Sequence, residues 1–316
     1  PFDIINFVKT GAPPRDVPMA KLGDLITFDR TEIESYRSVR KVLTNFLRRG
    51  RSQTRLIESK PISIAVFGQP GSGKSFGVEQ VAKSMFRDSR EWDWMEFNLS
   101  EFESPCDLAK AFHSVRDTVL TGRTPVAFFD EFDCTRESQH LGWLKYFLAP
   151  MQSGKFKEGE QLHPIGGAIF VFAGGTCHTF SQFSDDSQNA DKVAKKPDFI
   201  SRLSGHIDVL GPNGRKQIDG ACMLRRATLL RSLLRKHAAK FDHNGTLRID
   251  NSVVHAFLRA SEYRHGARSM ESIIRMSNLS GLKKFTAGAI PERDQLEMHV
   301  GANNFFDLLK EARTSN

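Results

Sequence analysis

Long apolar runs, clustered cysteines and tyrosines are scarce in this sequence of 316 residues. No apolar stretch approaches the ~20 residues that a membrane-spanning helix requires, so we expect no membrane association. The four cysteines lie far apart and form neither a C-x-x-C pair nor a Cys/His cluster at zinc-binding spacing. We therefore expect reduced core thiols in a cytoplasmic protein.

The first residues, "PFDIINFVKTG", lack a basic segment followed by an apolar one, so we do not expect a secretory signal there. They also lack an initiator Met, and we expect the chain to be part of a longer protein. Tyrosine occurs 3 times and phenylalanine 25 times, which indicates that most aromatic side chains belong to the core.

Negative charge is in deficit, and the formal net charge of +8 favours an anionic partner. The strongest basic clusters span residues 48–55 and 225–240. In the second cluster the arginines alternate with leucines at helical spacing, which is typical of a solvated helix face. Because the sequence has no aromatic-rich nucleic-acid module, nucleic acid is an alternative partner that we do not favour.

The clearest positive signal is the stretch "SIAVFGQPGSGKSFGVEQ", from Ser63 to Gln80. A buried-strand pattern runs into a glycine-rich loop, and a helical pattern follows. The glycines allow bends that aim several N–H groups at one anion, and the helix start adds its positive dipole end. The pattern G-x-x-x-x-G-K-[ST] predicts a phosphate site in which Lys74 reaches the β and γ phosphates and Ser75 ligates Mg²⁺.

A second stretch, "AFFDEFD" from Ala127 to Asp133, supplies carboxylates. Asp130 ends a predicted buried strand, where it can hold Mg²⁺ through the hydration shell. Glu131 follows directly and can polarise an attacking water as general base. The two stretches together predict nucleotide hydrolysis, with Ser75 and Asp130 as the metal-binding pair.

Strand patterns alternate with helical patterns through the first two thirds of the chain. This order predicts an α/β fold, a parallel P-loop sheet with helices on both faces, followed by a mainly helical lid. The predicted strands span residues 62–67, 94–100, 125–130 and 168–175.

Three parts are predicted: an N-terminal arm over residues 1–30, a P-loop ATPase core over 31–212, and a lid over 213–316. The string "TEIE" predicts that Thr31 caps the first core helix. In the lid, helices are expected near residues 217–239, 250–262 and 267–284. A short strand at 295–300 and a last helix are expected to close the chain.

These motifs resemble the AAA+ ATPase superfamily over most of the chain, from about Thr31 to Val300. "GQPGSGKS" resembles its Walker A motif and "AFFDEFD" its Walker B motif with the catalytic glutamate. "KPDFISRL" resembles the segment that ends in an arginine finger, and "HGARSMESII" resembles the sensor 2 motif of the lid. The lid motif, "FAGG" and "PDFISRL" together look most like the Clp and HslU side of the superfamily.

The resemblance implies residue roles beyond the two phosphate motifs. Arg202 would be the finger that enters a neighbouring subunit's site, and Arg268 would report the nucleotide state to the lid. Thr176 stands where the family usually has the sensor 1 asparagine. The catalytic set is then Lys74, Glu131 and Arg202. The predicted nucleotide-binding set comprises Gly68, Gln69, Pro70, Gly71, Ser72, Gly73, Lys74, Ser75, Phe76, Thr176 and Arg268.

The leading interpretation is an ATPase with ATP and Mg²⁺ as its nucleotide and metal. It would act in a homo-oligomeric ring or arc, a hexamer or heptamer, that remodels or moves an unknown protein partner. Threading members of the family carry an aromatic residue flanked by glycine after the second strand, whereas Phe102 in "SEFESPCD" has no glycine near it. This favours a second interpretation, an ATP-dependent scaffold or a signalling or defence platform without threading. A nucleic-acid motor or loader is the third.

Overall fold

A computed structural model describes residues 2–15, 17–50, 58–185, 194–213 and 220–314. Its centre is a five-stranded, all-parallel sheet with the strand order β4-β5-β8-β3-β9. The strands are β3 (Ile62–Phe67), β4 (Trp92–Asn98), β5 (Thr124–Asp130), β8 (Ile169–Ala173) and β9 (His206–Asp208). The predicted α/β class with a parallel sheet is confirmed, and four of the strands lie where the sequence places them.

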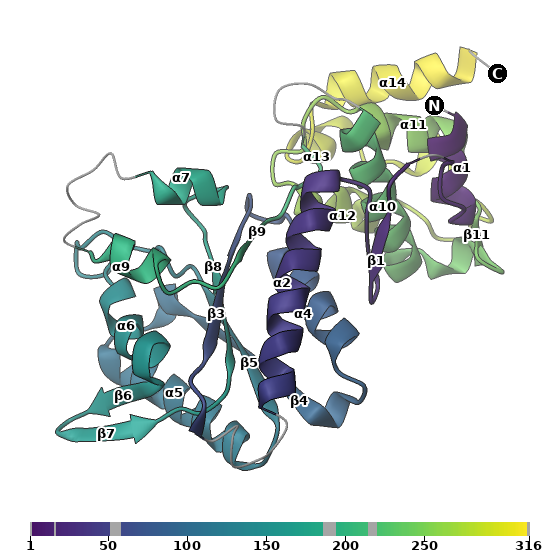
Figure 1. The fold of residues 1–316 in the computed structure, drawn as a ribbon. Coiled ribbons are helices and arrows are strands. Elements are labelled where there is room, and N and C mark those ends of the chain that lie inside the picture. The colour runs from purple at the N-terminus through teal and green to yellow at the C-terminus, as the bar shows by residue number, and fades with distance from the viewer. Residues whose placement is uncertain (1, 16, 51–57, 186–193, 214–219, 315–316) are drawn as a thin grey trace.

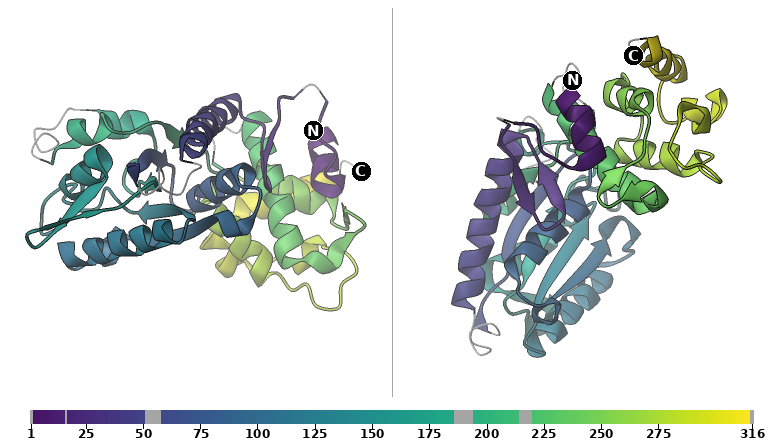
Figure 2. Two further views of the ribbon diagram at one scale, coloured as in Figure 1. Left: turned by 60° about the horizontal axis from the view of Figure 1, so that its bottom comes forward. Right: turned by 90° about the vertical axis from the view of Figure 1, so that its right-hand side faces the viewer.

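Side-chain alternation divides the sheet into two buried faces. On one face Phe129 and Phe172 pack with Phe112 and Phe147, which come from α5 (Pro105–Leu120) and α6 (Leu144–Ser153). On the other face Val66 and its neighbours pack against α2 (Arg30–Arg49) and α4 (Lys74–Met85). Figures 1 and 2 show the sheet between these two helix layers. Burial on both faces explains the nearly continuous apolar strands.

Short elements decorate the core. An antiparallel hairpin, β1 (Ala20–Leu22) and β2 (Leu25–Thr27), precedes α2. A second hairpin, β6 (Lys155–Glu158) and β7 (Gln161–Pro164), lies between α6 and β8, at the end of the core far from the lid (Figure 1). The remaining core elements are η1 (Ser89–Glu91), η2 (Leu99–Glu101), α7 (Phe180–Ser184) and α9 (Lys196–Ile200).

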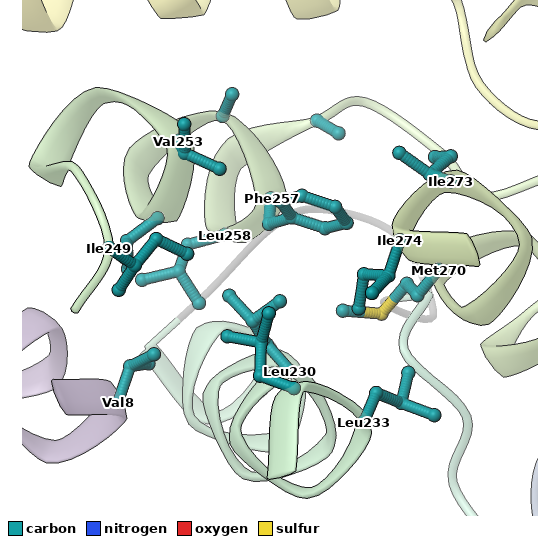
Figure 3. Close-up of a cluster of buried hydrophobic side chains, with 14 of the residues drawn as sticks. Val8, Leu230, Leu233, Ile249, Val253, Phe257, Leu258, Met270, Ile273 and Ile274 are labelled. Carbon is teal, nitrogen blue, oxygen red and sulfur yellow. The ribbon is translucent and has the colours of Figure 1, made fainter. Parts of the chain in front are cut away.

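The helical C-terminal region has a core of its own. Its elements are α10 (Gly220–His237), η3 (Ala239–Phe241), β10 (Asp242–His243), β11 (Thr246–Leu247), α11 (Asn251–Arg259), α12 (Ala267–Met276), η4 (Ala287–Ala289), α13 (Arg293–Glu297) and α14 (Ala302–Thr314). The N-terminal helix α1 (Phe2–Thr10) packs into the same cluster, where Val8 lies beside Leu230 and Ile249 (Figure 3). The first and last helices of the chain, α1 and α14, therefore both lie at the lid (Figure 1).

Four local predictions are wrong. The helix expected near residues 267–284 ends already at Met276. Helix α2 is capped by Asp29, whose side chain accepts from the N–H groups of Thr31 and Glu32, so Thr31 lies inside the helix. Residues 295–300 contain the end of α13 and a single bridge between Tyr263 and Val300, because the burial of Leu296 follows helix packing rather than strand pairing. The fifth strand β9 lies in a segment for which no strand was predicted.

The second basic cluster is a solvated face only in part, since Arg235, Lys236 and Lys240 are exposed whereas other arginines of the cluster make structural contacts. Arg226 is fully buried on α10, donates to the carbonyls of Pro212, Leu258 and Ala260, and stacks over Tyr263. On the same helix, Arg231 donates to the last carbonyls of α1, at Val8 and Lys9, where a cation suits the helix dipole. In the first cluster, residues 51–55 lie outside the described residues.

Across the described ranges, none of the helices combines the length and the hydropathy that a bilayer span demands.

Candidate nucleotide-binding site

A cavity of about 690 Å³ opens where the carboxyl ends of the sheet strands meet the lid. The sheet register aligns these ends, since Asp130 pairs with Ala173 and Val66 also pairs with Ala173. The lining combines the glycine-rich loop, the acidic stretch after β5, the loop after β8, residues 209–212 after β9, the β1–β2 hairpin with α2, and the lid helices α10 and α12.

The glycine-rich loop has the backbone shape that phosphate binding needs. Gly71 and Gly73 have φ angles of 74° and 91°, in the left-handed region that disfavours other residues. Helix α4 then begins at Lys74, so its free N–H groups point back toward the loop. The Lys74 ammonium donates to the carbonyl of Gly68 at 3.0 Å, and burial lowers the pKa of this lysine. Residues 70–76 line the cavity, with Phe76 more than a third exposed.

The acidic stretch places two carboxylates in the cavity. Asp130, at the end of β5, accepts from the N–H of Glu131 at 3.0 Å, and burial raises its pKa. Glu131 has φ of 52°, an unusual conformation for a residue with a side chain, and lines the cavity as an exposed group. Such strain concentrates at functional positions.

Asp133 joins the acidic stretch to the loop after β8, a role that sequence reasoning missed. Its carboxylate is 1% exposed and accepts from the N–H groups of Gly175 (2.8 Å), Thr176 (3.0 Å) and Cys177 (3.2 Å). It also accepts from the Thr176 hydroxyl at 2.6 Å. Thr176, the residue predicted at the sensor 1 position, lines the cavity, and its hydroxyl donates to Asp133.

The lid lies directly on the glycine-rich loop. The N–H of Ala267, the first residue of α12, donates to the carbonyl of Gly71 at 3.2 Å. A Cβ atom at Gly71 would lie 2.8 Å from the carbonyl oxygen of His265, so only glycine allows this approach. Arg268 follows in the first turn of α12 and lines the cavity beside Lys74, whose pKa its charge helps to lower.

Two further contacts tie the lid and the N-terminal hairpin to the cavity. Arg225 on α10 forms an ion pair with Asp29, the cap of α2, at 3.1 Å. The carboxylate of Glu32 is buried and accepts from the Thr27 hydroxyl and the N–H of Leu210, both at 2.6 Å. Burial raises the pKa of Glu32. No local sequence signal identified the contacts of Arg225 with Asp29 and of Leu210 with Glu32, because each joins segments far apart in the chain.

Arg202 and two loop residues lie elsewhere. Within the described residues, the cavity lining does not include Arg202, which follows α9 and donates to the carbonyl of Asp198 and to the Ser201 hydroxyl. Gln69 lines a neighbouring pocket, and Gly68 contributes its carbonyl to Lys74. The structure thus gathers the phosphate motifs and the lid arginine but leaves the proposed finger outside its own site.

Residues 64–165, which contain the glycine-rich loop and the acidic stretch, match the family described as "AAA: ATPase family associated with various cellular activities". A Torsin-like protein from Drosophila melanogaster is 26% identical over 207 residues, which is 63% of this chain. The chain spans about half the length of that relative, 51%.

Two solved structures share the fold of this chain. NtrX from Brucella abortus, in complex with ADP, aligns with a TM-score of 0.51 and 14% identity over 96% of this chain and 62% of its own. The Aeropyrum pernix ORC2 protein, in ADPNP–ADP complexes, aligns with a TM-score of 0.50 and 10% identity over 91% of this chain and 69% of its own. At these identities the two matches show the fold alone.

Proposed function

We propose that this chain is one subunit of a homo-oligomeric AAA+ ATPase that uses ATP hydrolysis to remodel or move a macromolecular partner. The proposal rests on the observation that only two of the three predicted catalytic residues line the same cavity. Lys74 and Glu131 share one cavity with Arg268, whereas Arg202 lies outside that cavity. A site that lacks its finger within one chain is completed when a second chain supplies it.

The residues present fit ATP with Mg²⁺. Asp130 is a partly buried carboxylate that lines the cavity with the Ser75 hydroxyl, and hard oxygen ligands of this kind suit Mg²⁺. Bound there, the ion would neutralise charge on the β and γ phosphates. The Ser72 hydroxyl is a buried polar atom with no hydrogen-bond partner among the described residues, as expected of a loop shaped for a phosphate group. The base is assigned as adenine from the AAA resemblance.

The catalytic step assigns one role to each side chain. Glu131 accepts a proton from the water that attacks the γ-phosphorus, and the bond to the ADP oxygen breaks. Lys74 holds the phosphates in line, and Arg268 reports their presence to the lid. Arg202 of the neighbouring chain stabilises the charge on the transferred group, an effect on the order of 10³–10⁵ in rate.

A non-threading scaffold is the second candidate, and one contact favours it. Phe102, the aromatic residue where a pore loop is expected, stacks edge-on against Trp143 at 5.9 Å between ring centroids. A side chain held in this way is poorly placed to grip a polypeptide. We keep the Clp and HslU likeness and a cytoplasmic location as parts of the proposal, and the ring size is left at six or seven subunits.

The test mixes two inactive variants. Arg202→Ala and Glu131→Gln should each bind ATP and lose most turnover, because they damage opposite sides of one interface. Their mixture should regain part of the activity, since some interfaces pair an intact Glu131 with an intact Arg202. Specific activity of the parent should rise with protein concentration.

Arg259→Ala, an exposed arginine on the lid helix α11, is the matched control and should keep parental turnover. If mixing restores nothing and specific activity is independent of concentration, the finger does not act between chains. A monomeric P-loop ATPase is then the better description.

A further inference from the structure

We propose that His113, Glu158 and His163 form a binding site for a divalent transition metal ion, with Zn²⁺ as the expected occupant, that fastens the β6–β7 hairpin to α5. The three side chains offer one ligand atom each, and these atoms all lie within 4.8 Å of one another. This cluster lines neither the nucleotide cavity nor the adjoining pocket.

The ligand atoms of the three side chains lie close to one another. The Glu158 carboxylate lies 2.8 Å from Nε2 of His113 and 3.8 Å from Nε2 of His163. The two imidazole rings are 5.0 Å apart between centroids. Ligands around a tetrahedral zinc are separated by ~3.4 Å, as bonds of about 2.0–2.1 Å require. The two measured separations bracket this value.

The strand pattern explains why these residues meet. Phe156 pairs with His163 across the hairpin, and Glu158 follows two residues after Phe156, so all three lie on one face. Phe156 is 3% exposed and packs against the His113 ring at 4.8 Å and the His163 ring at 5.4 Å between centroids. The phenyl ring therefore holds both imidazoles on the same side of the hairpin.

The chemistry of the set suits zinc. Two imidazoles and one carboxylate are typical zinc ligands, and three protein ligands leave a fourth position for water. The Glu158 carboxylate supplies oxygen ligand atoms, one of which lies 2.8 Å from Nε2 of His113. The charged neighbour on α5 is Arg116, whose guanidinium is occupied by Asp117 at 2.9 Å. Glu158 is half exposed, which leaves it room to adjust.

A bound ion would join two segments that are far apart in sequence. Residue 113 on α5 and residue 158 at the end of β6 are 45 positions apart. The hairpin also carries Leu162, whose side chain is among the most exposed large apolar groups at 65%. The ion would therefore hold in place a hairpin that presents an apolar residue to solvent.

The experiment titrates chelator-treated full chain with Co²⁺, without nucleotide, and follows the visible absorption, with Zn²⁺ then added as competitor. We expect one equivalent to bind, with a spectrum free of thiolate charge-transfer bands. His163→Ala and Glu158→Gln should each weaken binding by about 100-fold. His243→Ala, an exposed histidine in the β10–β11 hairpin, should bind as the parent does.

A second readout guards against misfolded variants. Zn²⁺ should raise the melting temperature of the parent and of His243→Ala, because a ligand that binds the folded state stabilises it. Zn²⁺ should leave the melting temperatures of His163→Ala and Glu158→Gln unchanged. The circular dichroism and ATP turnover of these two variants should match those of the parent. Unchanged Co²⁺ affinity in folded ligand variants, no binding at micromolar Co²⁺, or thiolate bands would each overturn the site and leave a His–Glu ion pair.

Discussion

The glycine-rich loop and the lid helix α12 both line one cavity, yet different kinds of interaction place them there. The loop takes its shape from residues within ten positions, with left-handed glycines and a helix that begins at Lys74. The lid reaches the cavity through contacts over long sequence distances, including Ala267 to Gly71 and Arg225 to Asp29. Local structure thus forms the phosphate side of the cavity, which is the glycine-rich loop with Lys74. Tertiary packing forms the lid side, which is α10 and α12 with Arg268.

This difference predicts an asymmetry in binding. Lys74 is half-buried behind the loop, where water screens its charge less than at the surface, so its attraction for a phosphate is stronger. Arg268 is exposed on the lid, so solvent screens its charge. The phosphate side should therefore dominate affinity, whereas the lid side should tune it.

The largest expected effect tests that asymmetry directly. Lys74→Ala should weaken ATP binding by about 1,000-fold or more, because it removes the cation of the phosphate loop. Arg268→Ala should weaken it by about 10-fold. Calorimetric titration with a non-hydrolysable ATP analogue measures both, with the exposed Lys83→Ala on α4 as control. Equal losses for the two variants would refute the asymmetry.

The next effect concerns Asp133, whose carboxylate joins the end of β5 to the loop after β8. Asp133→Asn keeps the shape but turns an N–H donor toward the donors of residues 175–177, so the loop that carries Thr176 should loosen. We expect turnover to fall by roughly 100-fold, or ~3 kcal/mol, while ATP affinity changes by less than about 3-fold. Asp117→Asn, an exposed acid on α5, is the control. Steady-state kinetics that show a change in ATP affinity alone would assign Asp133 to binding.

The smallest effect concerns the lid attachment. Arg225→Ala removes a mostly buried ion pair with Asp29, which also caps α2. We expect ATP affinity to fall by about 3- to 10-fold, or ~1 kcal/mol, with little change in turnover at saturation. Arg235→Ala on the exposed side of the same helix serves as control. A larger effect than that of Arg268→Ala would mean that lid position, rather than the lid arginine, governs binding.

Sequence reasoning succeeded where the signal was local. The alternation of apolar strands with helices predicted the α/β class and four strands, and the glycine pattern predicted the loop. Sequence reasoning failed where a residue or strand interacts with a segment far away in the chain. The strand β9 is three residues long and forms by pairing with β3, so its own sequence carries little signal. The leucine-spaced arginines predicted a solvated face, yet Arg226 finds three carbonyls inside the lid.

By itself, the sequence determined the phosphate loop and the acidic strand end, because glycine conformation, helix start and strand burial act over a few residues. Only the tertiary structure decided that Asp133 braces Thr176 and that α1 joins the lid. It alone brought together His113, Glu158 and His163. These groups meet because the sheet register and helix packing bring distant segments together, and no spacing within the chain encodes that meeting.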